Sequence, residues 1–200
     1  MANNLVEARA FLLTAPGIDL VDLEHGADVL TQLGVDTQVL HLSWGTHSEF
    51  GRVREPLDQA IFDESSHPKN DGPLILIGPG ISSSAAGLVA LDTANVGGAL
   101  LISPPEARFT AAARSDRNPA YHHADELFAE ALEEADATQL GKLTYFIPGD
   151  AGYRPKARHV VFSYDYPKPT YIYDDTRHLF RTRPGLQAIV NAVEGYSKKP

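Results

Sequence analysis

The chain has 200 residues, of which 43% are hydrophobic, and its formal net charge is −9. This length suits one domain with one core. The acidic balance disfavours nucleic acid and anionic membranes as partners, because both require basic protein surface. The absence of cysteine excludes disulfide bonds, thiolate metal sites and a cysteine nucleophile.

The N-terminal segment does not look like a targeting sequence. Residues 1–9 lack the basic part of a secretion signal, and the apolar run at 10–13 is too short for its hydrophobic part. No stretch approaches the roughly 20 apolar residues of a membrane span. We therefore expect a cytoplasmic protein with a small-molecule partner and with neither nucleic acid nor membrane as a partner.

Strand and helix patterns alternate from the start of the chain. The apolar run at 10–14 predicts a buried strand. Asp19 is a suitable N-cap for a helix whose apolar residues recur with helical spacing as far as Leu33, and Gly34 is placed to end it. A second strand is expected at 35–42. Such a β-α-β unit is nearly always parallel and right-handed.

The same alternation continues along the rest of the chain. Further strands are expected at 73–77, 98–103, 143–147 and 170–173, and further helices at 52–62, 82–94, 123–135 and 184–196. The segment 154–166 fits either a strand or a short helix. The pattern predicts a single α/β domain over 1–200, with a mostly parallel sheet and helices on both faces.

A glycine-rich turn joins the strand at 73–77 to the next helix, and residues 78–84 read GPGISSS. A serine at the tip of such a turn is held in a strained backbone conformation, with small residues two positions away on each side. Ser82 fits this tip, between Gly80 and Ser84. The amide of Ser83 would then point at the oxygen of a bound carbonyl group, where the helix N-terminus adds positive charge.

In this turn, and in the order of its later polar residues, the chain resembles the α/β-hydrolase family over 10–196. The resemblance implies a serine esterase or thioesterase with a catalytic triad and no cofactor or metal. Ser82 would form the acyl-enzyme, His178 would take its proton, and Asp150 would orient the imidazole of His178. Asp150 follows the expected strand at 143–147, and His178 precedes the last helix.

The resemblance also assigns roles around the triad. A second oxyanion donor would come from Gly17 or Ile18, because Pro16 has no amide hydrogen. Ile18 and Trp44 would contact the substrate, and Trp44 follows a strand end, where ligands bind in open α/β sheets. The chain matches the family from its third strand on, so the first antiparallel strands are expected to be lacking. The segment 104–140 takes the place of the family's lid.

The residues leave several alternatives open. If Gly78 and Ser82 are the small residues of the turn, Gly80 occupies its tip, and the protein is a non-catalytic small-molecule binder on the same fold. Ser84 is a second candidate nucleophile. The serines 82–84 also suit helix capping. The glycine-rich turn could instead cradle a phosphate, although it lacks the lysine of a P-loop.

A metal site at the paired histidines 122–123 is not expected. Adjacent residues point to different sides of a helix, and no third ligand lies at the usual spacing.

Overall fold

The computed structural model describes residues 8–44, 49–66, 72–102, 119–148, 170–173 and 179–197. Six strands in these ranges form one sheet in the order β2-β1-β3-β4-β5-β6, and all their pairings are parallel. The strands are β1 (Ala8–Leu13), β2 (Val35–Leu40), β3 (Leu74–Pro79), β4 (Val96–Ile102), β5 (Leu143–Pro148) and β6 (Thr170–Tyr173).

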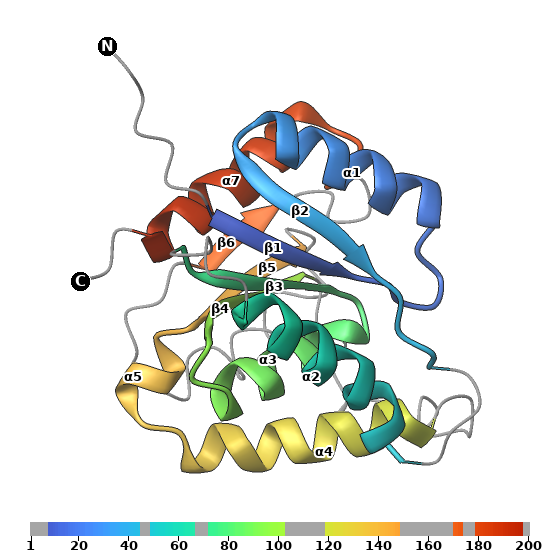
Figure 1. Cartoon of the computed structure of the whole chain (residues 1–200), viewed down its shortest axis with the longest axis vertical. Coiled ribbons are helices and arrows are strands. Elements are labelled where there is room, and N and C mark those ends of the chain that lie inside the picture. The colour runs from blue at the N-terminus through green and yellow to red at the C-terminus, as the bar shows by residue number, and fades with distance from the viewer. Residues whose placement is uncertain are drawn as a thin grey trace.

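Helices cover both faces of this sheet (Figure 1). α1 and α7 pack on one face, and α2, α3 and α4 pack on the other. This arrangement confirms the predicted fold class. The helices in the described part of the chain are α1 (Leu20–Gln32), α2 (Gly51–Ser65), α3 (Ser82–Asp92), α4 (Pro119–Glu134), α5 (Ala137–Leu140) and α7 (Arg183–Ser197).

Alternate residues of the central strand β3 face two different hydrophobic cores. Leu74 and Leu76 pack with α2, α3 and α4, whereas Ile75 and Ile77 pack with α1 and α7. None of the four side chains is more than 2% exposed. A strand covered on both faces must be apolar at every position, and this is why the sequence shows a continuous apolar run here.

The ends of α1 follow the predicted signals. The side chain of Asp19 accepts a hydrogen bond from the Val21 amide at 3.0 Å, as an N-cap residue does. The helix ends at Gln32, and Gly34 follows with a positive φ of 97°. Glycine tolerates this left-handed conformation, so the predicted stop is confirmed.

The helix α3 is buried from Ser82 to Leu91. It contacts α4 closely, because residue 87 has no side chain: a Cβ there would lie 2.4 Å from Cε2 of Phe128. Ala120, Ala124 and Leu132 of α4 are buried in the same core as Phe128. The α4 helix is therefore an integral part of the layer on this face.

This position of α4 bears on the segment 104–140, which was expected to be a lid. Its described part, residues 119–140, forms α4 and α5 and contributes apolar side chains to the core under the sheet. Residues 103–118 lie outside the described residues. A lid that covers the ligand stays a prediction.

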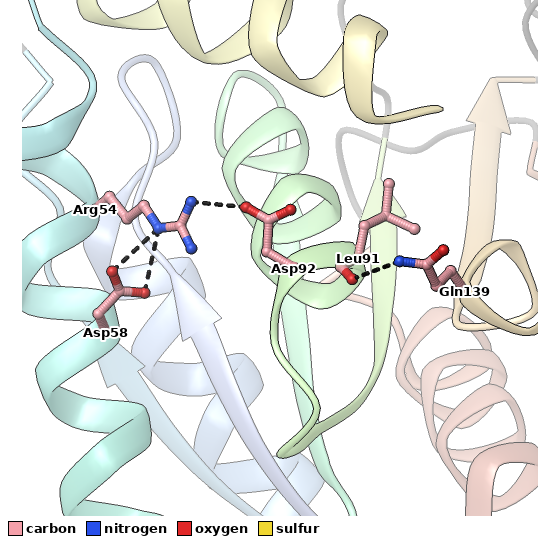
Figure 2. A network of polar contacts seen from close by, with 5 residues as sticks. All are labelled: Arg54, Asp58, Leu91, Asp92 and Gln139. Atoms are coloured by element: carbon pink, nitrogen blue, oxygen red, sulfur yellow. Dashed lines mark hydrogen bonds and ion pairs between the residues drawn. The ribbon is translucent and has the colours of Figure 1, made fainter. Parts of the chain in front are cut away.

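Side chains from other elements hold the C-terminal end of α3 (Figure 2). Nη1 of Arg54, from α2, donates to Asp92 at 2.8 Å, and Nε of Arg54 donates to Asp58 at 3.0 Å. Nε2 of Gln139, from α5, donates to the Leu91 carbonyl at 3.2 Å. Burial acts to lower the pKa of Arg54, but the hydrogen bonds and charges of Asp92 and Asp58 outweigh it and raise that pKa.

Lys142, just before β5, also binds this end of α3. Its Nζ donates to the carbonyl oxygens of Ala90 at 3.1 Å and Thr93 at 2.9 Å. A cation here matches the negative end of the helix dipole. Burial lowers the pKa of the Lys142 ammonium group.

α7 is attached to the sheet through Tyr196. The Tyr196 hydroxyl lies 2.6 Å from Oγ1 of Thr144 and donates to the Lys142 carbonyl at 2.9 Å. The ring occupies the space left by Gly98 of β4, where a Cβ would lie 2.3 Å from Cε1 of Tyr196. In the described part of the chain, no helix is long and apolar enough to cross a membrane.

Candidate functional site

The carboxyl ends of β1 and β3 mark a change of direction in the sheet. From β1 the chain passes through α1 to β2, and from β2 it passes through α2 to β3, on the other side of β1. α1 and α2 lie on opposite faces (Figure 1). Ligands of open α/β sheets bind at the carboxyl ends of the strands at such a switch point. The residues that follow β1 and β3 therefore form the candidate site.

The turn after β3 has glycine at its tip. Gly80 follows the last residue of β3 and has a φ of +54°. Two residues earlier, a Cβ on Gly78 would lie 2.4 Å from the carbonyl oxygen of Ser82 and 2.8 Å from Cβ of Ala86. The first turn of α3 therefore folds back onto Gly78, which makes Gly78 and Ser82 the small residues that flank the tip.

This geometry decides between the two registers that the sequence left open. Gly80, rather than Ser82, has the left-handed backbone of the tip. The catalytic role of Ser82 stays a prediction. The physical reason is the close approach of helix and strand. Of the two glycines of the turn, Gly78 lacks room for a side chain, whereas a Cβ on Gly80 would meet nothing nearer than Cδ1 of Ile18, at 3.9 Å.

Ser82 is instead the first residue of α3, with an exposed fraction of 0%. Its hydroxyl donates to the Thr14 carbonyl oxygen at 2.6 Å. Its Oγ also accepts a hydrogen bond from Nε1 of Trp44 at 3.1 Å. The hydroxyl hydrogen of Ser82 thus points at a backbone carbonyl at the end of β1, which is the opposite of the exposure that a nucleophile needs.

The next two serines also bind inside the protein. The amide of Ser83 donates to the Gly80 carbonyl at 3.1 Å, and its hydroxyl donates to the same oxygen. The amide of Ser83 therefore closes the turn, and its oxyanion role stays a prediction. The hydroxyl of Ser84 donates to Oδ1 of Asp125 in α4 at 3.1 Å. The capping alternative is also wrong, because Ile81 is the N-cap residue and no side chain caps it.

The loop after β1 lies beside the tip of the turn. Gly17 has a φ of +82°, and the amide of Ile18 donates to the Ala15 carbonyl at 3.2 Å. The side chain of Ile18 is the nearest neighbour of the space above Gly80. The structure thus brings Ile18, a predicted substrate-binding residue, to the candidate site. The oxyanion role of Gly17 stays a prediction.

Trp44 reaches the same place from the segment after β2. Its indole Nε1 donates to the Thr14 carbonyl at 3.2 Å as well as to Ser82. The ring stacks on Phe50 at a centroid distance of 6.3 Å and is 2% exposed. Trp44 thus belongs to the hydrophobic core beside the turn, and its contact with the substrate stays a prediction.

The other two predicted triad residues, Asp150 and His178, lie outside the described residues. Their roles stay predictions.

Metal ligands do not gather in the part of the chain that the structure describes: no group of three His, Cys, Asp or Glu side chains there could hold an ion. Of the paired histidines, His123 accepts a hydrogen bond from the Phe50 amide through Nδ1, at 3.2 Å. This contact joins α4 to the start of α2.

Comparison with known proteins identifies the fold through structure alone. No protein-family model and no curated protein sequence matches the chain. A soluble variant of monoglyceride lipase from Saccharomyces cerevisiae, in complex with a substrate analog, is similar with a TM-score of 0.65 and 12% identity, over 98% of this chain and 89% of that one.

Two further solved structures show the same likeness. A variant of tomato methylketone synthase I, complexed with beta-ketoheptanoate, gives a TM-score of 0.64 at 11% identity, over 96% of this chain and 99% of that one. The esterase domain of a Rhodothermus marinus protein gives 0.62 at 15% identity, over 97% of this chain and 87% of that one. The chain has the α/β-hydrolase fold.

Sequence reasoning did not single out Thr14, the residue on which the site converges. Thr14 closes an apolar run and carries no catalytic group. Its carbonyl oxygen, which accepts from Ser82 and Trp44, belongs to the backbone and leaves no signal in the sequence.

Proposed function

We propose that the protein binds a small molecule with a carbonyl or carboxylate group at the carboxyl ends of β1 and β3, above Gly80, and forms no acyl-enzyme. The observation that carries this proposal is Gly80 at the tip of the turn, with a φ of +54°. In a serine hydrolase of this fold the tip presents the attacking oxygen. Glycine presents none.

The chemistry around the tip supports the class of ligand. The N-terminus of α3 begins directly after the turn and carries partial positive charge, which favours a carbonyl oxygen or an anion. Ile18 adds an apolar wall. Tomato methylketone synthase I, similar in fold, was solved with beta-ketoheptanoate, a carboxylate with a short apolar chain.

Hydrolysis of an ester or thioester is the second candidate function. It is favoured by the similarity in fold to a monoglyceride lipase and an esterase domain. In this mechanism Ser82 would attack the acyl carbon, His178 would take the serine proton and return it to the leaving group, and Asp150 would orient the imidazole. Ser82 would first have to leave the Thr14 carbonyl, which it binds at 2.6 Å.

Labelling with a fluorophosphonate probe separates the two functions. We expect no labelling of the wild type or of Ser82→Ala. Labelling of the wild type that is lost in Ser82→Ala would overturn the proposal in favour of hydrolysis. Gly80→Ser is the matched gain-of-function variant, because space for the new side chain exists and the left-handed backbone costs only about 1–2 kcal/mol. Labelling gained in Gly80→Ser alone supports Gly80 as the tip.

Binding is measured separately by calorimetry with heptanoate and with heptanol. Because the positive end of α3 faces the ligand, we expect the carboxylate to bind more tightly than the alcohol. Equal binding of the two compounds would contradict recognition of the carboxylate.

A further inference from the structure

Three segments of the chain meet at the carbonyl oxygen of Thr14. Ser82, at the start of α3, donates to it at 2.6 Å, and Trp44, after β2, donates to it at 3.2 Å. The hydroxyl of Thr14 accepts a further hydrogen bond from the Leu42 amide at 2.8 Å. Ser82 is 0% exposed and Trp44 is 2% exposed, so both donors are shielded from solvent.

The loop between β1 and α1 begins at Thr14. Residues 15–18 form a tight turn in which the Ile18 amide donates to the Ala15 carbonyl at 3.2 Å. The loop is thus a short turn that continues directly from Thr14. At its end, Ile18 lies beside the tip glycine, with its Cδ1 3.9 Å from where a Cβ of Gly80 would stand.

We infer that Ser82 and Trp44 are positioning residues for the ligand: they hold the Thr14 carbonyl so that Ile18 forms an apolar wall above Gly80. The wall selects a ligand whose carbonyl or carboxylate group is joined to an apolar chain of several carbons. This inference rests on the proposed function, whose ligand it narrows. It gives Ser82 a role that differs from that of a nucleophile and requires its hydroxyl.

Chain-length discrimination tests the role in selectivity. Calorimetry measures the affinities for heptanoate and propanoate of the wild type and of three variants, Ser82→Ala, Ile18→Ala and Ser84→Ala. We expect Ser82→Ala and Ile18→Ala to weaken heptanoate binding roughly fivefold, because each variant loses the equivalent of one hydrogen bond or one small apolar contact. Propanoate binding should change less than about twofold in both variants.

The matched control is Ser84→Ala, which removes a hydroxyl of the same helix that binds Asp125 instead of Thr14. It is expected to leave the ratio of the two affinities unchanged. An equal loss for both acids in Ser82→Ala would indicate a merely structural role and overturn the inference.

Amide hydrogen exchange tests the positioning without any ligand. Ser82→Ala and Trp44→Phe each remove one donor to Thr14, and the phenyl ring keeps the stacking on Phe50. We expect the Ile18 amide to exchange about tenfold faster in both variants, as the loop opens more often, and not in Ser84→Ala. Unchanged exchange overturns the positioning role. If the loop responds but the wild type binds neither acid, the proposed ligand is wrong while the role of Ser82 and Trp44 in the loop is supported.

Discussion

The two ends of α3 are held in different ways. At the N-terminal end, three short serine side chains are at most 2% exposed, and the hydroxyl of each donates a hydrogen bond to an oxygen atom close by; they are Ser82, Ser83 and Ser84. At the C-terminal end, the long side chain of Arg54 reaches Asp92, and these two side chains are 28% and 39% exposed. Figure 2 shows how far Arg54 and Gln139 extend to this end from neighbouring helices.

The two ends therefore differ in how exactly the backbone must be positioned for their side-chain contacts to form. A serine hydroxyl makes its bond only if the partner oxygen lies within about 3 Å of it, so the backbone must already be in place. A long charged side chain adapts to small shifts, and water weakens its attraction. The candidate ligand site lies at the end with the stricter requirement.

The largest effect is expected where strand and helix approach most closely. Gly78→Ala places a Cβ 2.4 Å from the Ser82 carbonyl oxygen, so the backbone of β3 or of α3 must move. We expect a loss of about 3 kcal/mol in the free energy of unfolding, measured with urea. Gly195→Ala in α7 is the control, because nothing lies within 4 Å of its new Cβ. An unchanged stability of Gly78→Ala would contradict the tight turn.

The partly buried hydrogen bond from Ser84 to Asp125 should contribute less to stability. Ser84→Ala removes one hydrogen bond, so we expect a loss of about 1 kcal/mol that does not depend on salt. A double-mutant cycle with Asp125→Ala isolates the pair from the other contacts of Asp125. A coupling energy near zero would show that the pair does not join α3 to α4.

The exposed ion pairs of Arg54 should contribute less still. Arg54→Ala is expected to cost about 0.5–1 kcal/mol at low salt and clearly less at high salt, because ions screen exposed charges. Urea unfolding at two salt concentrations measures the change. If the loss is the same at both, the two ends of α3 do not differ as described.

The smallest effect concerns Lys142 and pH. Its pKa in the folded protein is lowered by burial from the ordinary value of 10.5. Between the two pKa values the unfolded chain binds more protons than the folded protein, so stability rises with pH there. Unfolding midpoints measured up to pH 10.5 should therefore rise for the wild type relative to Lys142→Met. A difference that is flat, or that falls as pH rises, would contradict this sign.

The fold could be predicted from the sequence because the patterns that mark its strands and helices each lie within a short stretch of the chain. Continuous apolar runs such as that in β3 gave the strands, and Asp19 and Gly34 gave the ends of α1. The four-residue helix α5 was missed, because one turn is too short to show a period.

Only part of the candidate site could be predicted from the sequence. Two alignments of the glycine-rich turn satisfy the same spacing rule, and the choice depends on which glycine the helix approaches. A Cβ on Gly78 would lie 2.4 Å from backbone, whereas one on Gly80 would lie 3.9 Å from a side chain. The partner of Ser82 is Thr14, 68 positions away in the chain, and a local pattern cannot reveal such a contact.

The position of α7 has a consequence for the synthesis of the protein. This helix covers one face of the sheet together with α1, and its side chains share a core with Ile75, Ile77 and Leu100. Because a ribosome delivers the chain from its N-terminus, the strands that carry these residues emerge well before residues 183–197. The nascent sheet thus exposes the part of this apolar face that α7 covers until α7 arrives, and such exposed surface favours aggregation.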